Sequence, residues 1–123
     1  MKIGLIAPGG FDPGGEERVI PVFLWLVERL AQRHEVHVYT LYQDYRPAEY
    51  TLLGAHIHNL GYRRSRPGSL GQGRRALPAL QRENRRGRFD VLHGLWAQES
   101  GLIAAAVGRL WGVPSVVTVA GGE

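Results

Sequence analysis

The sequence predicts an α/β domain in which helices cover both faces of a parallel sheet. Short apolar runs alternate with segments of helical period, and glycine and proline separate them. The first strand, helix and second strand fit into about forty residues, a unit that is almost always right-handed with parallel strands. With 123 residues, of which 44% are apolar and 21% charged, the chain has the size and composition of a single globular domain, residues 1–123.

The first third of the chain contains two predicted strands around one helix. Lys2–Ala7 is a nearly continuous apolar run, typical of a buried parallel strand, and a glycine-rich turn follows it. Apolar residues then recur at helical spacing from Val19 to Ala31, with Glu16 and Glu17 placed to begin the helix. Pro21 predicts a bend or a late helix start. His34–Thr40 alternates and is the second strand.

The middle of the chain is less regular. Tyr42–Leu53 has no clean period, whereas Ala55–Leu60 alternates histidines with aliphatic residues and is the third strand. Turn residues then favour a loop, a helix beginning near Pro78, and a helix end at Gly87. Phe89–His93 is the fourth strand.

The last third predicts one helix and one strand. Glu99–Trp111 reads as a helix whose small residues pack closely on a sheet; these are Gly101, Ala104, Ala105 and Gly108. Ser115–Val119 is the fifth strand, and we expect the strand order 3-2-1-4-5. Because no helix follows to cover this strand, we expect a sheet that is incomplete on its C-terminal side and a chain that is a fragment.

Composition excludes several classes of function. Cysteine is absent, which excludes disulfides, thiolate metal sites and a cysteine nucleophile, and is compatible with a reducing cytoplasm. The longest apolar runs fall well short of the ~20 residues that a membrane span needs. The apolar start is also too short for a signal peptide, and no cleavage site follows it.

The net charge of +4 is concentrated in one segment. Residues 62–88 carry nine arginines and one acid, including an arginine-rich connector at 62–77. Such a segment is either a solvated surface or a docking site for an anionic membrane or another polyanion, with Arg63, Arg64, Arg74 and Arg75 as contacts. Nucleic acid is disfavoured, because the aromatic residues that stack single-stranded bases are missing between the arginines.

Two features at the predicted carboxyl ends of the strands are candidates for ligand contact. The amides of Gly14 and Gly15 precede the first helix and could approach an anionic group, although a plain tight turn explains them too. The spacing is neither the dinucleotide fingerprint nor a Walker loop, and the second strand lacks the acid that binds ribose, which excludes a dinucleotide-dependent oxidoreductase. His93 ends the fourth strand and either contacts a hydroxylated ligand or caps the strand.

His56 and His58 lie two residues apart on the third strand and could pair on a metal ion. The sequence places no third ligand near them, so we expect no metal site. Asp90, at the other end of the fourth strand from His93, is expected to be structural.

Four segments together resemble the N-terminal domain of family 4 glycosyltransferases, the retaining GT-B enzymes. They recur in the family's order and spacing across nearly the whole chain: Gly14–Val19, Leu30–Val36, Phe89–His93 and Gly112–Thr118. The resemblance implies a Rossmann-like domain that holds the acceptor, facing a second domain that binds the nucleotide sugar. It also implies that Gly14 and Gly15 approach the donor diphosphate, and that His93, Trp96 and Glu123 line the acceptor site.

The chain departs from the family pattern at two positions. Ala120 stands where relatives often have a histidine in a Thr-x-His-Gly pattern. Arg33 stands where glycine is usual, so we expect it to adopt a left-handed helix cap at a cost of ~1 kcal/mol.

The resemblance implies the acceptor-side half of a retaining, nucleotide-sugar-dependent glycosyltransferase that needs no metal or other cofactor. Its expected partners are a C-terminal donor-binding domain, a sugar, lipid or glycan acceptor, an anionic membrane surface and, through the fifth strand, a second copy. We expect a cytoplasmic protein, with a peripheral position on the inner membrane face as an option. The isolated chain is expected to be inactive, because one wall of a two-domain site cannot stabilise the departing diphosphate. The alternative is a non-catalytic α/β module that binds a polyanion.

Overall fold

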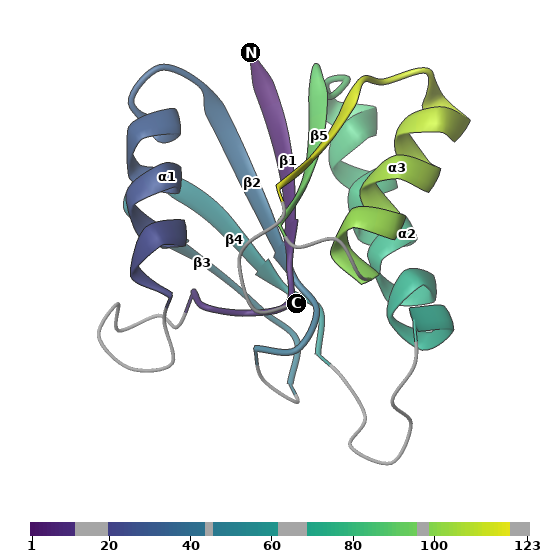
Figure 1. Ribbon diagram of the computed structural model, residues 1–123, viewed down its shortest axis with the longest axis horizontal. Helices are drawn as coiled ribbons and strands as arrows, with labels where there is room; N and C mark the ends of the chain where they lie inside the picture. Colours follow the sequence, from purple (N-terminus) through teal and green to yellow (C-terminus); the bar gives the residue numbers. More distant parts are fainter. Residues whose placement is uncertain (12–19, 44–45, 62–68, 96–98, 119–123) are drawn as a thin grey trace.

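The computed structural model is a three-layer α/β domain (Figure 1). It describes residues 1–11, 20–43, 46–61, 69–95 and 99–118, and no side chain of residues 69–74. The strands are β1 (Lys2–Ala7), β2 (Glu35–Thr40), β3 (Ala48–Leu52), β4 (Ala55–Asn59), β5 (Val91–Leu95) and β6 (Ser115–Thr118). The helices are α1 (Pro21–Ala31), α2 (Ser69–Arg86) and α3 (Glu99–Trp111).

The described strands form one sheet in the order β3-β4-β2-β1-β5-β6. All neighbours pair in parallel except β3 and β4, which are antiparallel. The five parallel strands are the five predicted strands in the predicted order 3-2-1-4-5. The fold class is therefore confirmed as α/β and Rossmann-like.

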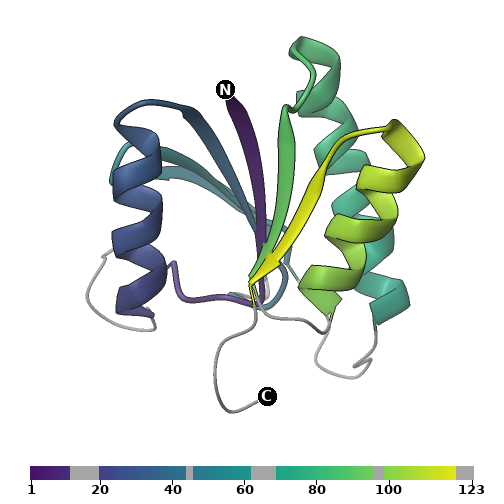
Figure 2. The ribbon, with the colours of Figure 1, turned by 45° about the horizontal axis from the view of Figure 1, so that its top comes forward.

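Figure 2 shows α1 on one face of the sheet and α2 and α3 on the other, and a hydrophobic core lies on each face. On one face, Phe23, Leu24 and Val27 of α1 pack against the aliphatic residues of β1, β2 and β4. On the other face, α2 and α3 cover a second cluster that includes Tyr39, Leu80 and Phe89. Alternate residues of β1, β2 and β5 therefore pack into opposite cores, which explains the nearly continuous apolar sequence of β1.

The edge strand β3 was not predicted. Its burial pattern is mostly exposed, so the sequence of Ala48–Leu52 carries little of the apolar alternation that identifies a strand. Leu53 and Gly54 follow it with φ of 51° and 85°, which makes the tight turn into β4. Strand pairing with β4, rather than local periodicity, defines this segment.

The late start predicted for the first helix is confirmed, whereas the start predicted for the second helix is wrong. The described part of α1 begins at Pro21, where the missing amide hydrogen costs nothing because the first turn has no intrahelical acceptor. The helix expected from Pro78 instead begins at Ser69 and contains Pro78 in its interior. Burial of Ala76 and Leu80 on the sheet outweighs the local cost of that proline.

Two finer predictions were wrong. Among the described residues, Leu53 is the one non-glycine with positive φ, so Arg33 does not form a left-handed cap. The chain leaves α1 through Gln32 in a right-handed conformation and needs no such residue. Ala105 is exposed, whereas Gly101, Ala104 and Gly108 do face the sheet.

No helix in the described parts of the chain is long and apolar enough to cross a membrane.

Candidate functional site

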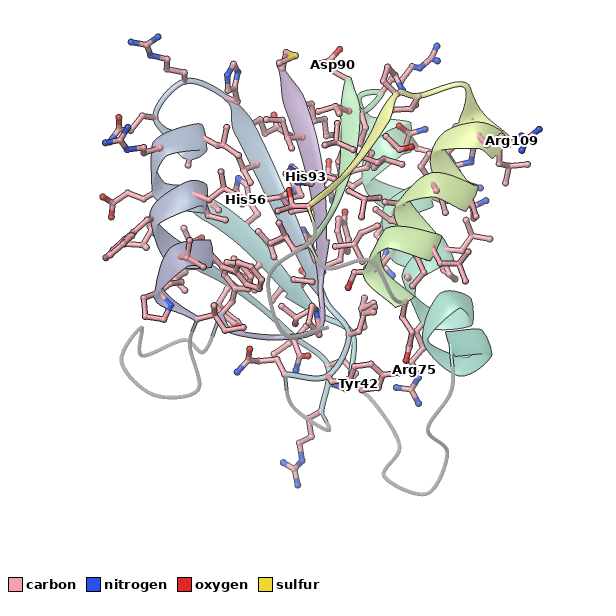
Figure 3. All side chains as sticks on the ribbon, viewed as in Figure 1. Tyr42, His56, Arg75, Asp90, His93 and Arg109 are labelled. Carbon is pink, nitrogen blue, oxygen red and sulfur yellow. The ribbon has the colours of Figure 1, made fainter. Side chains whose placement is uncertain are left out.

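The carboxyl ends of β1, β2, β5 and β6 meet at one edge of the sheet, here named the carboxyl edge. In open parallel sheets, ligands bind at this edge. Figure 3 shows Tyr42, which follows β2, at the lower edge of the molecule and Asp90, which precedes β5, at the opposite edge. The side chains that follow the strands are therefore the first candidates for ligand contact.

The turn after β1 is held by the segment after β2. Gly10 has φ of 95°, and a Cβ there would meet Ile20 Cγ1 at 2.9 Å, so this position needs glycine. The Phe11 amide donates to Gln43 Oε1 at 2.8 Å, and the Tyr50 hydroxyl donates to the Phe11 carbonyl. The turn is thus fixed up to Phe11, and the predicted diphosphate contacts Gly14 and Gly15 lie outside the described residues.

Contrary to the prediction, His93 does not end its strand, because β5 continues to Leu95, which pairs with Thr118 of β6. The side chain of His93 faces a hydroxyl group. Its Nε2 is 2.5 Å from the Thr118 hydroxyl oxygen at the end of β6. Burial lowers the pKa of His93 below the ordinary 6.5, so the imidazole is neutral near pH 7. A neutral imidazole has one N–H donor and one acceptor nitrogen, which is the chemistry needed to bind a hydroxyl group.

A second polar pair at this edge joins β2 to α3. The Tyr42 hydroxyl donates to Glu99 Oε2 at 2.5 Å, and Glu99 occupies the first turn of α3, where a carboxylate is favoured by the helix dipole. Burial, followed by the hydrogen bond to Glu99, raises the pKa of Tyr42. The phenol therefore stays protonated and keeps its donated hydrogen bond.

The start of α3 is positioned by a glycine-to-glycine contact. A Cβ on Gly94 would lie 2.6 Å from Gly101 Cα and 2.7 Å from the Ser100 carbonyl oxygen. Only glycine lets β5 approach α3 this closely. Because Gly94 follows His93 directly, this contact also fixes the position of the His93 backbone relative to α3.

Several predicted site residues cannot be placed. The predicted acceptor contacts Trp96 and Glu123, like the predicted surface contacts Arg63 and Arg64, lie outside the described residues. The backbone of Arg74 lies in α2, and its side chain is outside the described part.

Arg75 is half-buried, and its guanidinium lies 3.5 Å from the Leu60 carbonyl oxygen, which follows β4. This contact holds α2 against the end of β4. The guanidinium of Arg75 is therefore engaged within the domain rather than projecting freely.

Other predicted residues lie away from the carboxyl edge. Asp90 accepts from the Lys2 amide at 2.7 Å and its own amide donates to the Lys2 carbonyl at 2.8 Å, which joins β1 to the start of β5. Its predicted structural role agrees with this contact. His56 and His58 lie on the sheet face that α2 covers, and His93 does not join them.

The Tyr42–Glu99 and Phe11–Gln43 contacts were missed by sequence reasoning. Both join segments far apart in the chain, and each polar residue lies in a loop or a helix start without a recognisable motif. The position of Tyr42 and Gln43 directly after the second predicted strand was the one available signal, since that position lies at the carboxyl edge.

Comparison with known proteins agrees with this arrangement. No curated protein sequence matches the chain. The family described as glycosyl transferase 4-like domain matches residues 19–122, which is 104 of the 123 residues. The match covers all described elements after β1. The chain therefore belongs to the glycosyl transferase 4-like domain family, the N-terminal domain of family 4 glycosyltransferases.

Proposed function

We propose that this chain is the acceptor-side domain of a retaining, nucleotide-sugar-dependent glycosyltransferase. The observation that carries the proposal is the contact between the neutral His93 imidazole, in the middle of β5, and the Thr118 hydroxyl at the carboxyl end of β6. A sugar hydroxyl has the same donor and acceptor groups as threonine, so an acceptor could replace Thr118 as the partner of His93. Family membership supports glycosyl transfer as the reaction class. The usual binding of ligands at the carboxyl ends of parallel strands supports an acceptor site at this edge.

The second wall of the active site is proposed to come from a donor-binding domain. That domain would hold the nucleotide sugar, while backbone amides at Gly14 and Gly15 approach the diphosphate. Transfer needs stabilisation of the negative charge on the leaving diphosphate by groups aimed at it from both walls. The isolated chain is therefore expected to give no turnover of nucleotide sugars, and turnover above a buffer control would contradict the two-wall reaction.

Acceptor binding is tested with the isolated chain and short alkyl glycosides in saturation-transfer NMR. We expect a weak complex whose dissociation constant rises roughly two- to tenfold in His93→Ala, which corresponds to loss of one hydrogen bond of about 0.5–1.5 kcal/mol. The matched control is His56→Ala, because His56 is an exposed histidine on β4 and on the opposite face of the sheet from His93. Equal weakening by both variants, or no binding at all, would count against the proposal.

Docking on an anionic membrane surface is a second candidate, favoured by the exposed arginines of α2. The Arg82 side chain is 70% exposed, and its nearest described carboxylate is Glu49 at 3.9 Å. Arg85 and Arg86 are also exposed in the last turns of the helix. These charges continue the arginine-rich connector and would act as a salt-sensitive contact for anionic lipids.

Vesicle flotation tests that surface. The chain is mixed with vesicles of neutral lipid alone or neutral lipid with phosphatidylserine, at low and high salt. Binding only to the anionic vesicles, lost at high salt and in a variant with Arg63, Arg64, Arg74, Arg82 and Arg85 changed to Gln, supports docking. Salt-independent binding, or binding that the variant retains, argues against it.

A further inference from the structure

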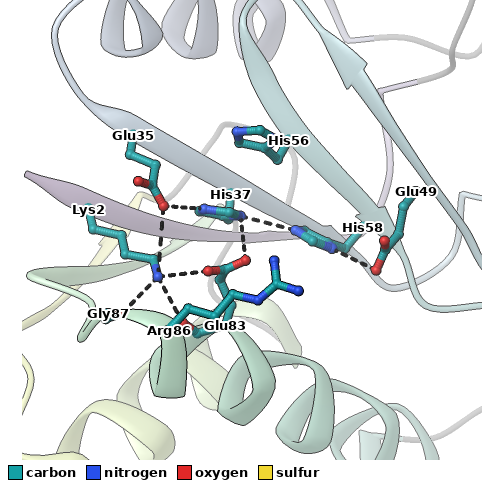
Figure 4. Close-up of a pocket in the computed structure, with 9 residues that line it drawn as sticks. All are labelled: Lys2, Glu35, His37, Glu49, His56, His58, Glu83, Arg86 and Gly87. Carbon is teal, nitrogen blue, oxygen red and sulfur yellow. Dashed lines mark hydrogen bonds and ion pairs between the residues drawn. The ribbon is translucent and has the colours of Figure 1, made fainter.

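A cluster of histidines and carboxylates lies under α2, apart from the carboxyl edge (Figure 4). It lines a pocket of about 460 Å³. His37 of β2, His58 of β4 and Glu83 of α2 point toward one another, and one ligand atom of each lies within 4.8 Å of the other two. The pairing of β2 with β4, which sets His37 beside His56 and Tyr39 beside His58, brings these rings onto the same face.

Two of the three distances between the ligand atoms are close to those of a tetrahedral metal site. His37 Nδ1 is 3.1 Å from His58 Nε2 and 3.6 Å from Glu83 Oε1. Ligands about 2.0–2.1 Å from a tetrahedral Zn²⁺ ion lie roughly 3.3 Å from one another. The two measured distances bracket that value, and rotation of the Glu83 carboxylate adjusts the third.

In each histidine ring, the nitrogen that faces away from the cluster contacts a carboxylate, and this contact indicates which nitrogen carries the hydrogen. His37 Nε2 is 2.7 Å from Glu35 Oε2, and His58 Nδ1 is 3.3 Å from Glu49 Oε1. Each carboxylate requires an N–H donor, so the neutral tautomers carry their hydrogen on these outer nitrogens. The inner nitrogens, His37 Nδ1 and His58 Nε2, then face each other as two lone pairs and need a cation between them.

The carboxylate–histidine pairs on both sides are the arrangement that orients metal-bound histidines in proteins. Stacking fixes the rings further. The His58 ring lies on Tyr39 with centroids 4.6 Å apart, and the His37 ring lies between the face of His56 at 4.8 Å and the edge of Phe89 at 6.1 Å. The two inner nitrogens are therefore held in place before any ion arrives.

The charged side chains that line the pocket favour binding of a cation. Glu35, Glu49 and Glu83 line the pocket together with Lys2 and Arg86, so three carboxylates face two cationic groups. Lys2 Nζ binds Glu83 Oε2 at 2.8 Å, which leaves Oε1 of that carboxylate toward His37. A proton shared by the two nitrogens would not bind Glu83 Oε1 as well. A metal ion would bind all three atoms.

We propose that His37 Nδ1, His58 Nε2 and Glu83 Oε1 bind one divalent transition-metal ion of the Zn²⁺ type. A water molecule from the pocket completes the tetrahedron. The ion joins β2, β4 and the last turns of α2, and so fastens that helix to the sheet. This replaces the expectation of no metal site, which rested on the lack of a third ligand near His56 and His58.

The test uses tag-free chain, first treated with a chelator and then titrated with Co²⁺ and Zn²⁺. We expect one Co²⁺ per chain with the intense visible absorption of a tetrahedral ion, displacement by Zn²⁺, and a rise in the unfolding temperature with added Zn²⁺. A folded chain that binds neither metal, or that binds Co²⁺ only with the weak absorption of an octahedral ion, would overturn the proposal.

Variants locate the site. His58→Gln and Glu83→Gln should each weaken metal binding more than a hundredfold, and Glu49→Gln, which removes an orienting carboxylate, about 10- to 100-fold. His93→Gln is the matched control, because this histidine of β5 lies outside the pocket and outside the three ligands. Circular dichroism verifies that each variant folds. Equal losses in His93→Gln and Glu49→Gln, or undiminished binding in His58→Gln and Glu83→Gln, would contradict the assignment.

Discussion

A substitution at Gly94 tests most directly how closely the backbone of β5 approaches α3. In Gly94→Ala, the added methyl would lie 2.6 Å from Gly101 Cα, whereas ordinary contacts begin at 3.4 Å. The strand and helix must therefore separate by about 0.8 Å, and all three of the nearest atoms belong to the backbone. Overpacking of this kind costs about 1–3 kcal/mol, and we expect the upper end because no side chain can rotate away.

The change is measured by urea unfolding and thermal denaturation, followed by circular dichroism. A loss of about 3 kcal/mol in the free energy of unfolding corresponds to a fall of about 12 °C in the unfolding temperature for a domain of this size. Gly87→Ala is the matched control, because its nearest contact would be Lys2 Nζ at 3.7 Å. If Gly94→Ala lost less than about 1 kcal/mol, the close approach of β5 to α3 would be refuted.

Three other predictions address the site, α2 and the amino edge of the sheet. Burial lowers the pKa of His93, so its contribution to the free energy of unfolding is present above pH 6.5 and is lost as the pH falls below that value. Urea unfolding over a pH series should therefore show a smaller loss of stability at low pH in His93→Gln than in wild type. Pro78→Ala should stabilise the chain by about 2 kcal/mol in thermal denaturation, because Pro78 is exposed inside α2, and destabilisation would argue against the long helix. Lys2→Met should cost about 3 kcal/mol in metal-free buffer, because Lys2 and Glu83 are each 11% exposed and ion-paired at 2.8 Å; a cost below about 1 kcal/mol would show that the pair is solvated.

Most of the parallel sheet was predictable because its strands are apolar or alternating runs, most of them bounded by glycine or proline. Lys2–Ala7 shows this most clearly, and Glu99–Trp111 was predicted with the bounds that the structure has. Where long-range contacts decide the outcome, sequence reasoning failed. β3 depends on pairing with β4, and the early start of α2 depends on packing of Ala76 and Leu80 against the sheet.

The candidate sites divide in the same way. His93 was identified because the sequence placed it at the carboxyl end of a predicted strand, and ligands bind at such ends in open sheets. The convergence of His37, His58 and Glu83 was missed because it needs the register between β2 and β4 as well as the position of α2. With strand order alone, His56 and His58 remain two ligands without a third.

The most direct test of the proposed acceptor function is an amide-shift map of the isotope-labelled chain titrated with an alkyl glycoside. We expect the largest shifts at Phe11, Tyr42 and Thr118 of the carboxyl edge and at His93, which contacts Thr118, and no shift at Lys2 or Asp90 on the opposite edge. Saturable shifts confined to Lys2, Asp90 and their neighbours would contradict an acceptor site at the carboxyl ends of the strands.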